Sequence, residues 1–217
     1  MAHKAVIFDL DGTLLDTLAD IAESMNSVLR RCGYPEHTRH EYKYLVGEGM
    51  ESLARRALPE KHRDAASLAE CVAGMHKEYG MRWAEQTRPY DGIDTLLNEL
   101  ARREIKMAVL SNKPDNFTRE MVVKYFPNIH FEIVAGAKST VPKKPHPASA
   151  LEIATHLNIL PADFLFVGDT KIDIETAVAA GMYPVGALWG FRTADELNAS
   201  GARSLIEKPG ELLALLK

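Results

Sequence analysis

Short apolar runs that end in polar residues recur along the chain and predict the strands of a buried sheet. The first is KAVIFD, and it ends in a carboxylate. Runs this short, without alternation of apolar and polar residues, are typical of strands buried on both faces. We therefore expect a sheet built from the segments at residues 4–9, 107–112, 131–136, 164–169 and 184–190.

Between the later runs, apolar residues recur at three- and four-residue spacing, which predicts helices. The expected helices cover residues 93–103, 115–125, 147–157 and about 173–180. A further short helix is expected after Thr193, with Glu196 completing a capping box. Alternating strands and helices imply right-handed crossovers and a parallel sheet with helices on both faces. The expected fold class is therefore α/β, with a doubly wound parallel-sheet (Rossmann-like) core.

The segment from about residue 17 to residue 85 has helical periodicity only, with expected helices around 18–29, 50–57 and 68–83. Asp16 is expected to cap the first of them. Because this block follows the first strand, it is an insertion into the α/β domain. We predict a core of residues 1–16 and 88–217 and an inserted all-helical cap domain of residues 17–87.

Composition excludes several classes of protein. The 217 residues are 46% apolar and 26% charged, as in ordinary globular chains, and the net charge of −4 argues against a nucleic-acid partner. No apolar run approaches the roughly 18 residues of a membrane span, and the N-terminus does not have the pattern of a signal peptide. Cys32 and Cys71 offer no disulfide framework and are expected to be core residues in a reducing compartment. A soluble, cytoplasmic monomer or homodimer without a membrane partner is expected.

Polar residues capable of chemistry follow four of the expected strands. Ligands of open parallel sheets collect at the carboxyl ends of the strands, so these residues are expected to meet there. They are Asp9 and Asp11, Ser111, Lys144 in the loop KKPHP, and Asp169 with Asp173.

The spacing of the carboxylates supports a shared site. Asp9 and Asp11 are two residues apart at a strand end, and Asp169 and Asp173 are four apart at a helix start. Gathered carboxylates repel one another unless a cation lies between them. Oxygen ligands without clustered His or Cys favour a hard ion, so we expect Mg²⁺.

Four segments, in order, resemble the motifs of haloacid-dehalogenase-like hydrolases: VIFDLDGTLLDT (6–17), Ser111, Lys144 in KPHP, and GDTKID (168–173). Longer segments resemble phosphoglycolate phosphatases, so that the resemblance covers the whole chain. They are DTLADIAESMN (16–26), VGEGMESLARRAL (46–58), SNKPDNF (111–117) and WGFRTADELNASGARSLIEKPGEL (189–212). The resemblance implies a Mg²⁺-dependent phosphatase acting on a small phosphorylated metabolite, with 2-phosphoglycolate as the expected substrate.

The resemblance also implies roles for the residues at the strand ends. Asp9 is the expected nucleophile and forms an aspartyl-phosphate, which divides one slow hydrolysis into two faster steps. Asp11 is expected to protonate the leaving alkoxide and then to deprotonate the attacking water. Lys144 is expected to offset charge between the phosphate and Asp9.

The metal and phosphate ligands are implied in the same way. Mg²⁺ is expected to bind Asp9, Asp169 and the backbone carbonyl of Asp11, while Asp173 holds a bound water or orients Lys144. Thr170 supports this group. The expected phosphate ligands are Ser111, the amide of Asn112, Gly12 and Thr13.

Each motif also has a purely structural interpretation. GDTKID is compatible with an Asx-type helix cap, and Ser111 with a cap for the following turn. Lys143 and Lys144 are compatible with a solvated pair, although the position before Pro-x-Pro favours Lys144 as the functional one.

The loop VGEGM in the cap is the candidate for substrate specificity, through Gly47, Glu48 and Gly49. Glu48 disfavours an anionic substrate tail unless a cation offsets it, and Lys43 and Arg55 are the candidates for that cation. A cap-surface turn without substrate contact is the structural alternative.

Other functions fit parts of the pattern. A receiver-like phospho-switch also phosphorylates an aspartate, but such modules are about half this length. A hexose-phosphate mutase resembles the first motif, but residues 18–22 lack the histidine expected there. An inorganic pyrophosphatase or a broad sugar-phosphate phosphatase stays open, because Glu48 and Asp91 depart from the phosphoglycolate phosphatase pattern.

Overall fold

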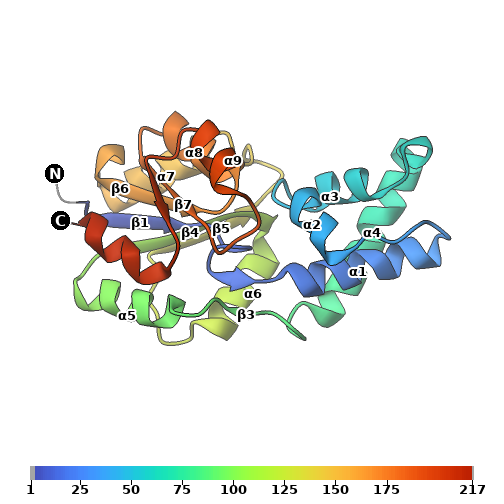
Figure 1. The fold of residues 1–217 in the computed structure, drawn as a ribbon, viewed down its shortest axis with the longest axis horizontal. Coiled ribbons are helices and arrows are strands. Elements are labelled where there is room, and N and C mark those ends of the chain that lie inside the picture. The colour runs from blue at the N-terminus through green and yellow to red at the C-terminus, as the bar shows by residue number, and fades with distance from the viewer. Residues whose placement is uncertain (1–2, 217) are drawn as a thin grey trace. The chain divides into compact units, whose positions relative to one another are not determined.

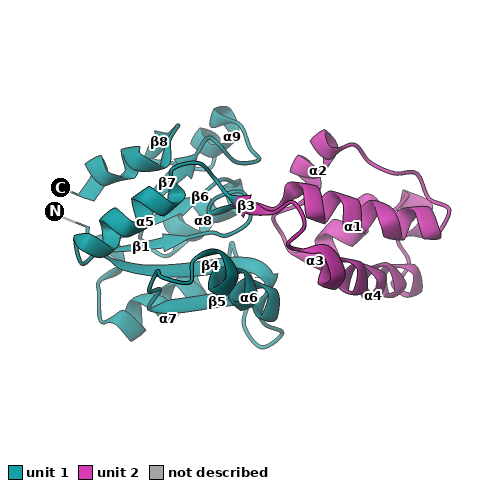
Figure 2. Ribbon diagram, turned by 90° about the horizontal axis from the view of Figure 1, so that it is seen from below, with its two compact units in different colours: residues 1–15, 89–217 teal, residues 16–88 magenta. Residues whose placement is uncertain are grey.

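The computed structural model describes residues 3–216 (Figure 1). The chain forms two compact units, Met1–Leu15 with Pro89–Lys217, and Asp16–Arg88 (Figure 2). It passes between the units at two short strands, β2 (Leu15–Asp16) and β3 (Arg88–Pro89), which pair with each other. The second unit is thus one uninterrupted stretch of sequence, whereas the first is assembled from two.

The first unit contains a sheet of six strands in the order β5-β4-β1-β6-β7-β8, and every pairing in it is parallel. Ala5 lies opposite Lys106 of β4 on one side and Phe164 of β6 on the other. The expected doubly wound α/β fold is therefore confirmed. The strands are β1 (Ala5–Phe8), β4 (Lys106–Pro114), β5 (Ile133–Ala137), β6 (Phe164–Gly168), β7 (Tyr183–Ala187) and β8 (Ser204–Ile206).

Helices cover both faces of this sheet, with α5 on one side and α7 and α8 on the other (Figure 1). Alternate residues of β1 face opposite sides, and Ala5 and Ile7 pack with Ile153 of α7 and Ala177 of α8 in one buried cluster. The helices are α5 (Ile93–Arg102), α6 (Asp115–Tyr125), α7 (Ala148–Leu157), α8 (Lys171–Ala179) and α9 (Ala194–Ala199), with short 3₁₀ turns η2 (Pro161–Asp163) and η3 (Pro209–Leu216).

The second unit is helical. Its elements are α1 (Leu18–Arg31), α2 (Arg39–Leu45), α3 (Met50–Ala57), the 3₁₀ turn η1 (Glu60–His62) and α4 (Ala65–Arg82). Buried Asp20 at the start of α1 accepts hydrogen bonds from the backbone amides of Gln86 and Thr87, which ties the two ends of the unit together. None of the helices in the described residues is long and apolar enough to cross a membrane.

Three local expectations were wrong. Thr17, and not Asp16, is the N-cap residue of α1; Asp16 lies in β2, from which its carboxylate approaches Arg39 and Arg88 at 3.8 and 4.0 Å. Cys32 is exposed because it follows the last turn of α1, although Cys71 is buried as expected.

The third concerns the start of α9. Thr193 accepts from the amide of Glu196, but the Glu196 carboxylate bonds Arg192 at 3.2 Å. The second half of the expected capping box is therefore not formed.

Ile153 in α7 tests the packing of the helix on the sheet, because its side chain is only 2% exposed. We expect Ile153→Ala to lower the free energy of unfolding by about 2–5 kcal/mol, through lost burial and the cavity left behind. Leu151→Ala in the same helix is the control, since Leu151 is 38% exposed. Urea denaturation should show a much smaller effect for the control; equal losses would contradict the packing described.

Candidate active site

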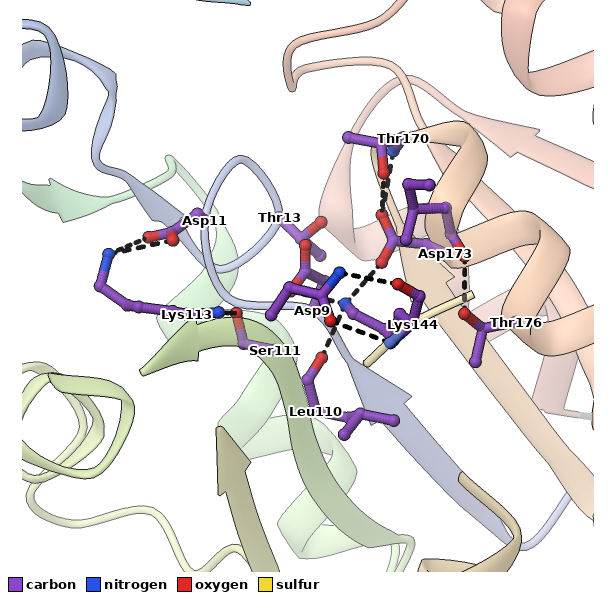
Figure 3. A network of polar contacts seen from close by, with 12 residues as sticks. Asp9, Asp11, Thr13, Leu110, Ser111, Lys113, Lys144, Thr170, Asp173 and Thr176 are labelled. Carbon is purple, nitrogen blue, oxygen red and sulfur yellow. Dashed lines mark hydrogen bonds and ion pairs between the residues drawn. The ribbon is translucent and has the colours of Figure 1, made fainter. Parts of the chain in front are cut away.

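The site lies at one edge of the sheet in the first unit, where parallel strands bring their carboxyl ends together (Figure 3). Asp9 directly follows β1, and Asp169 directly follows β6. Ser111 lies in β4, the strand between β1 and β5 in the sheet. Lys144 lies in the loop from β5 to α7. Residues from four separate stretches of sequence thus meet at this edge.

Lys144 connects these stretches. Its ammonium lies 2.9 Å from Oδ1 of Asp9 and donates hydrogen bonds to Oδ1 of Asp173 at 2.7 Å and to the carbonyl of Leu110 at 2.8 Å. The side chain is 2% exposed, whereas Lys143 is on the surface. The Asn112 side chain holds the Lys144 backbone, accepting from its amide at 2.9 Å and donating to its carbonyl at 3.0 Å.

Three buried carboxylates, those of Asp9, Asp169 and Asp173, each place one oxygen within 4.8 Å of the others. Asp169 is held from both sides, since Oδ1 accepts from the Thr13 hydroxyl at 2.9 Å and Oδ2 from the Phe191 amide at 2.8 Å. These hydrogen bonds fix the orientation of the Asp169 carboxylate. The Asp173 carboxylate is anchored in a similar way.

Asp173 has a structural role as well as a place in this cluster. Its Oδ2 accepts hydrogen bonds from the Thr170 amide at 3.0 Å and from the Thr170 hydroxyl at 2.7 Å, at the start of α8. Its Oδ1 accepts from Lys144. The helix-cap interpretation of GDTKID and the expectation that Asp173 orients Lys144 therefore both describe contacts that are present.

Charge is unbalanced in this cluster. Burial, followed by repulsion from Asp173, raises the pKa of Asp9 to about 7 even though Lys144 opposes the shift. Burial and the same repulsion raise the pKa of Asp169 well above its usual range. Burial alone would lower the pKa of Lys144, but Asp173 and Asp9 raise it above its usual value, so the lysine stays charged. One ammonium thus faces three carboxylates, and this oxygen donor set fits a hard divalent cation such as Mg²⁺.

Asp11 does not join this cluster. Its two carboxylate oxygens lie 2.8 and 3.0 Å from the ammonium of Lys113, and Figure 3 shows the side chain pointing away from Asp9. Only the backbone carbonyl of Asp11 was expected to bind the metal. The other two expected metal ligands, Asp9 and Asp169, bring their carboxylates together, and Asp173 supplies the third carboxylate of the cluster.

Close packing around Asp169 requires glycine at position 12. Gly12 has φ +87°, and a Cβ there would lie 2.3 Å from Oδ2 of Asp169. Thr13 directs its hydroxyl to Asp169, while its carbonyl accepts from Nε1 of Trp189 at 2.9 Å. The side chain of Thr13 therefore positions a carboxylate, and its amide donates to the Leu10 carbonyl at 3.3 Å.

Ser111 caps the turn at the end of β4, because its hydroxyl accepts from the Lys113 amide at 3.2 Å. The structural interpretation of Ser111 is thus present in the fold. A hydroxyl that accepts one hydrogen bond still has its own proton to donate. Ser111 therefore keeps a donor for an anionic oxygen.

The loop VGEGM (46–50), the candidate for substrate specificity, belongs to the second unit. Gly47 and Gly49 both have positive φ, and Glu48 pairs with Arg56. Arg55 instead approaches Glu51 at 3.4 Å. The cation beside Glu48 is therefore Arg56, one residue further along α3 than Arg55, and the naming of Lys43 and Arg55 was wrong.

Sequence reasoning missed Lys113 as a site residue. The available signal was its position two residues after Ser111, at the end of an expected strand. Also missed were the hydrogen bonds from Trp189 to Thr13 and from Phe191 to Asp169. The first spans 176 residues of sequence and the second 22, and neither leaves a local pattern.

Comparison with known proteins agrees with this geometry. The family model of haloacid dehalogenase-like hydrolases matches residues 6–187. The chain is 32% identical over 210 residues to the phosphoglycolate phosphatase of Xanthomonas campestris pv. campestris (strain 8004), covering 96% of this chain and 94% of that protein. It is 30% identical over 213 residues to the phosphoglycolate phosphatase of Aquifex aeolicus (strain VF5), covering 98% and 96%.

Solved structures show the same likeness. A crystal structure from Lactobacillus delbrueckii subsp. bulgaricus, assigned as a phosphoglycolate phosphatase, superposes with a TM-score of 0.93 at 28% identity and covers 100% of this chain and 99% of that one. The family model and these relatives extend over both units and include each strand end described above. The chain therefore belongs to the haloacid dehalogenase-like hydrolases, in the phosphoglycolate phosphatase-like family, and it is a phosphatase.

Proposed function

We propose that this phosphatase is Mg²⁺-dependent and hydrolyses a small phosphate monoester, 2-phosphoglycolate, through an aspartyl-phosphate on Asp9. The observation that carries the proposal is the position of Asp9. Its carboxylate is buried at the end of β1, contacts Lys144 at 2.9 Å and shares a cluster with Asp169 and Asp173. A buried carboxylate beside a fixed cation is suited to attack phosphorus, because positioning and charge neutralisation dominate phosphoryl transfer.

The reaction has two balanced steps. An Asp9 oxygen bonds to phosphorus while the ester P–O bond breaks, and the departing alkoxide takes a proton from Asp11. Water then attacks the phosphorus and gives a proton to Asp11. The bond between the Asp9 oxygen and phosphorus breaks, so that phosphate is released and the Asp9 carboxylate is restored. One group thus acts as acid and then as base.

Mg²⁺ would be held by Asp9, Asp169 and the backbone carbonyl of Asp11, and when bound it supplies positive charge to the phosphate oxygens. Asp173 already bonds Lys144 and Thr170, so we assign it to orienting Lys144. Lys144 holds positive charge beside Asp9. Ser111 and the amide of Asn112 bind the remaining phosphate oxygens. The amides of Gly12 and Thr13, which were also expected to do so, already donate to the carbonyls of Leu15 and Leu10.

The choice of 2-phosphoglycolate is supported by the names of the relatives from Xanthomonas campestris and Aquifex aeolicus. We assign residues 17–87 the role of a cap and the loop around Glu48 the role of substrate selection. Arg56 offsets the charge of Glu48, which removes the objection to an anionic substrate tail. A panel of phosphate esters and inorganic pyrophosphate, assayed with Mg²⁺, tests this choice; preference for pyrophosphate or for sugar phosphates would overturn it.

Asp9→Asn should abolish the reaction but stabilise the metal-free protein. The substitution removes the attacking charge, so we expect kcat to fall by several orders of magnitude. It also removes a buried charge whose pKa is raised to about 7. The folded wild type therefore binds a proton more tightly than the unfolded chain, and its ionised Asp9 lowers stability above about pH 7.

Thermal unfolding without divalent ions should show this effect directly. The stability advantage of Asp9→Asn over the wild type should be largest above about pH 7, where the folded wild type carries the ionised carboxylate. It should shrink as the pH falls from about 7 towards the usual aspartate pKa of 3.8, below which Asp9 is protonated in both the folded and the unfolded wild type. Asp94→Asn, at an exposed position of α5, is the matched control and should change neither property. Retention of more than about a tenth of wild-type activity by Asp9→Asn would rule out the covalent mechanism.

Ca²⁺ should inhibit in competition with Mg²⁺. It accepts six to eight oxygens and bidentate carboxylates, whereas Mg²⁺ requires near-octahedral geometry. A carboxylate engaged through both oxygens has none left to attack phosphorus, so Asp9 would bind Ca²⁺ without reacting. Initial rates over a grid of the two ions measure this; equal turnover with either ion would show that Asp9 is not a metal ligand.

Glu48→Gln should change substrate preference without changing the Mg²⁺ requirement. It leaves Arg56 without its carboxylate partner, so we expect the ratio of kcat/KM for 2-phosphoglycolate to that for a phosphate ester with a neutral tail to rise. Glu51→Gln is the control, since it disrupts only the exposed pair with Arg55. An unchanged ratio in Glu48→Gln would mean that specificity resides elsewhere.

A further inference from the structure

Lys113 is a buried cation at the edge of the site, and the mechanism above does not use it. Its side chain is 4% exposed, and its ammonium lies 2.8 and 3.0 Å from the two oxygens of Asp11. The Asp11 side chain is 20% exposed. The two residues are 102 positions apart, so only the pairing of β1 with β4 brings them together.

Both backbones are fixed where the pair forms. The Lys113 amide donates to the Ser111 hydroxyl at 3.2 Å, and its carbonyl accepts from the Thr118 hydroxyl at 3.3 Å. On the other side, the Gly12 amide donates to the Leu15 carbonyl at 2.9 Å, which closes the turn that carries Asp11. The Lys113 ammonium faces this turn and therefore selects one rotamer of the Asp11 side chain. Several rotamers are otherwise open to a side chain that is 20% exposed.

The location of Lys113 relates it to the leaving group. Ser111, a proposed phosphate ligand, accepts a hydrogen bond from the Lys113 amide at 3.2 Å, so the two residues are neighbours at the irregular end of β4. The organic part of a phosphate ester begins beyond the phosphate. The departing oxygen leaves on the side of phosphorus opposite the attacking Asp9 oxygen, and the Asp11 carboxylate held by Lys113 points away from Asp9 (Figure 3).

We propose that Lys113 is a positioning residue that acts through Asp11: it holds the Asp11 carboxylate in the orientation from which Asp11 serves the leaving group. This inference rests on the proposed function, in which Asp11 is the acid and base. The Lys113 ammonium contacts both carboxylate oxygens of Asp11. Its effect therefore belongs to the leaving group, and it disappears when Asp11 cannot transfer a proton.

The simpler interpretation is that Asp11 merely neutralises a buried lysine. In that case the loss of Lys113 affects folding or all substrates alike. The two interpretations differ in how the effect depends on the ester, because alkoxide leaving groups need protonation and p-nitrophenolate does not.

The test is a double-mutant cycle of Lys113→Met and Asp11→Asn, measured as kcat/KM on 2-phosphoglycolate and on p-nitrophenyl phosphate. We expect Lys113→Met to lower kcat/KM for the alkyl ester roughly 10- to 100-fold and for the aryl ester much less. The double variant should be no slower on the alkyl ester than Asp11→Asn alone. Lys113→Arg, which keeps the cation, should recover part of the activity.

Lys4→Met is a control for the loss of a lysine–aspartate pair away from the site, because Lys4 pairs with Asp163 at 2.7 Å at the opposite end of β1, although its side chain is 66% exposed. It should leave both substrates unchanged. Should Lys113→Met fail to fold, as judged by thermal unfolding, Lys113→Gln repeats the cycle with a neutral donor of similar size.

The outcomes separate the inference from the function on which it rests. Multiplicative losses in the double variant, or equal losses on both esters, would overturn the role of Lys113. If Asp11→Asn itself fails to discriminate between the esters, the acid–base role of Asp11 fails, and this inference fails with it. Selective, non-additive loss supports both.

Discussion

Mutual repulsion among three buried carboxylates is the constraint on which the rest of the site depends. Asp9, Asp169 and Asp173 share one edge of the sheet, and Lys144 offsets their charge through its contacts with Asp9 and Asp173. The surroundings are organised to hold them despite this repulsion. Thr13, Phe191 and Thr170 donate to the carboxylates, and Asn112 fixes the loop that carries Lys144. The raised pKa of Asp9 expresses the remaining imbalance, which a divalent cation would remove.

This arrangement places competing demands on the fold. A protein selected only for stability would not bury three acids beside one base, since unpaired buried charge is costly. The parallel sheet makes the arrangement possible, because it supplies several strand ends at one edge while its core packs on α7 and α8 beneath them. Gly12 contributes by its lack of a side chain, which lets the first turn approach Asp169 closely.

Much of the core was predictable because its elements carry strong local signals. Apolar runs located β1, β4, β5 and β6 to within one or two residues, while β7 ends three residues before its expected end, and helical periodicity located α6 at residues 115–125. Strand-end positions then led to Asp9, Ser111, Lys144 and Asp169. In contrast, α2 was missed because it buries only Tyr42, and β8 because it has three residues at the edge of the sheet.

The contacts that fix side-chain orientation were not predictable in the same way. Asp16 was expected to cap α1, but its place in β2 directs its carboxylate towards arginines. Arg56 rather than Arg55 pairs with Glu48, because helix phase decides which of two adjacent arginines faces the loop. Lys113 meets Asp11 across 102 residues. Each of these contacts depends on three-dimensional register, which a single sequence does not encode in any local pattern.

The uninterrupted helical unit has a consequence for how the chain folds during synthesis. β1 emerges from the ribosome first, but its partners β4 and β6 begin at Lys106 and Phe164, about 100 and 160 residues later. The helical unit, Asp16–Arg88, is a compact unit formed by one continuous stretch of sequence, and that stretch is synthesised before either partner strand. Local helical contacts form quickly, whereas long-range parallel pairings are slow. We therefore expect the inserted unit to fold first, leaving β1 tethered to it, with one edge exposed until β4 is synthesised and the other until β6 is.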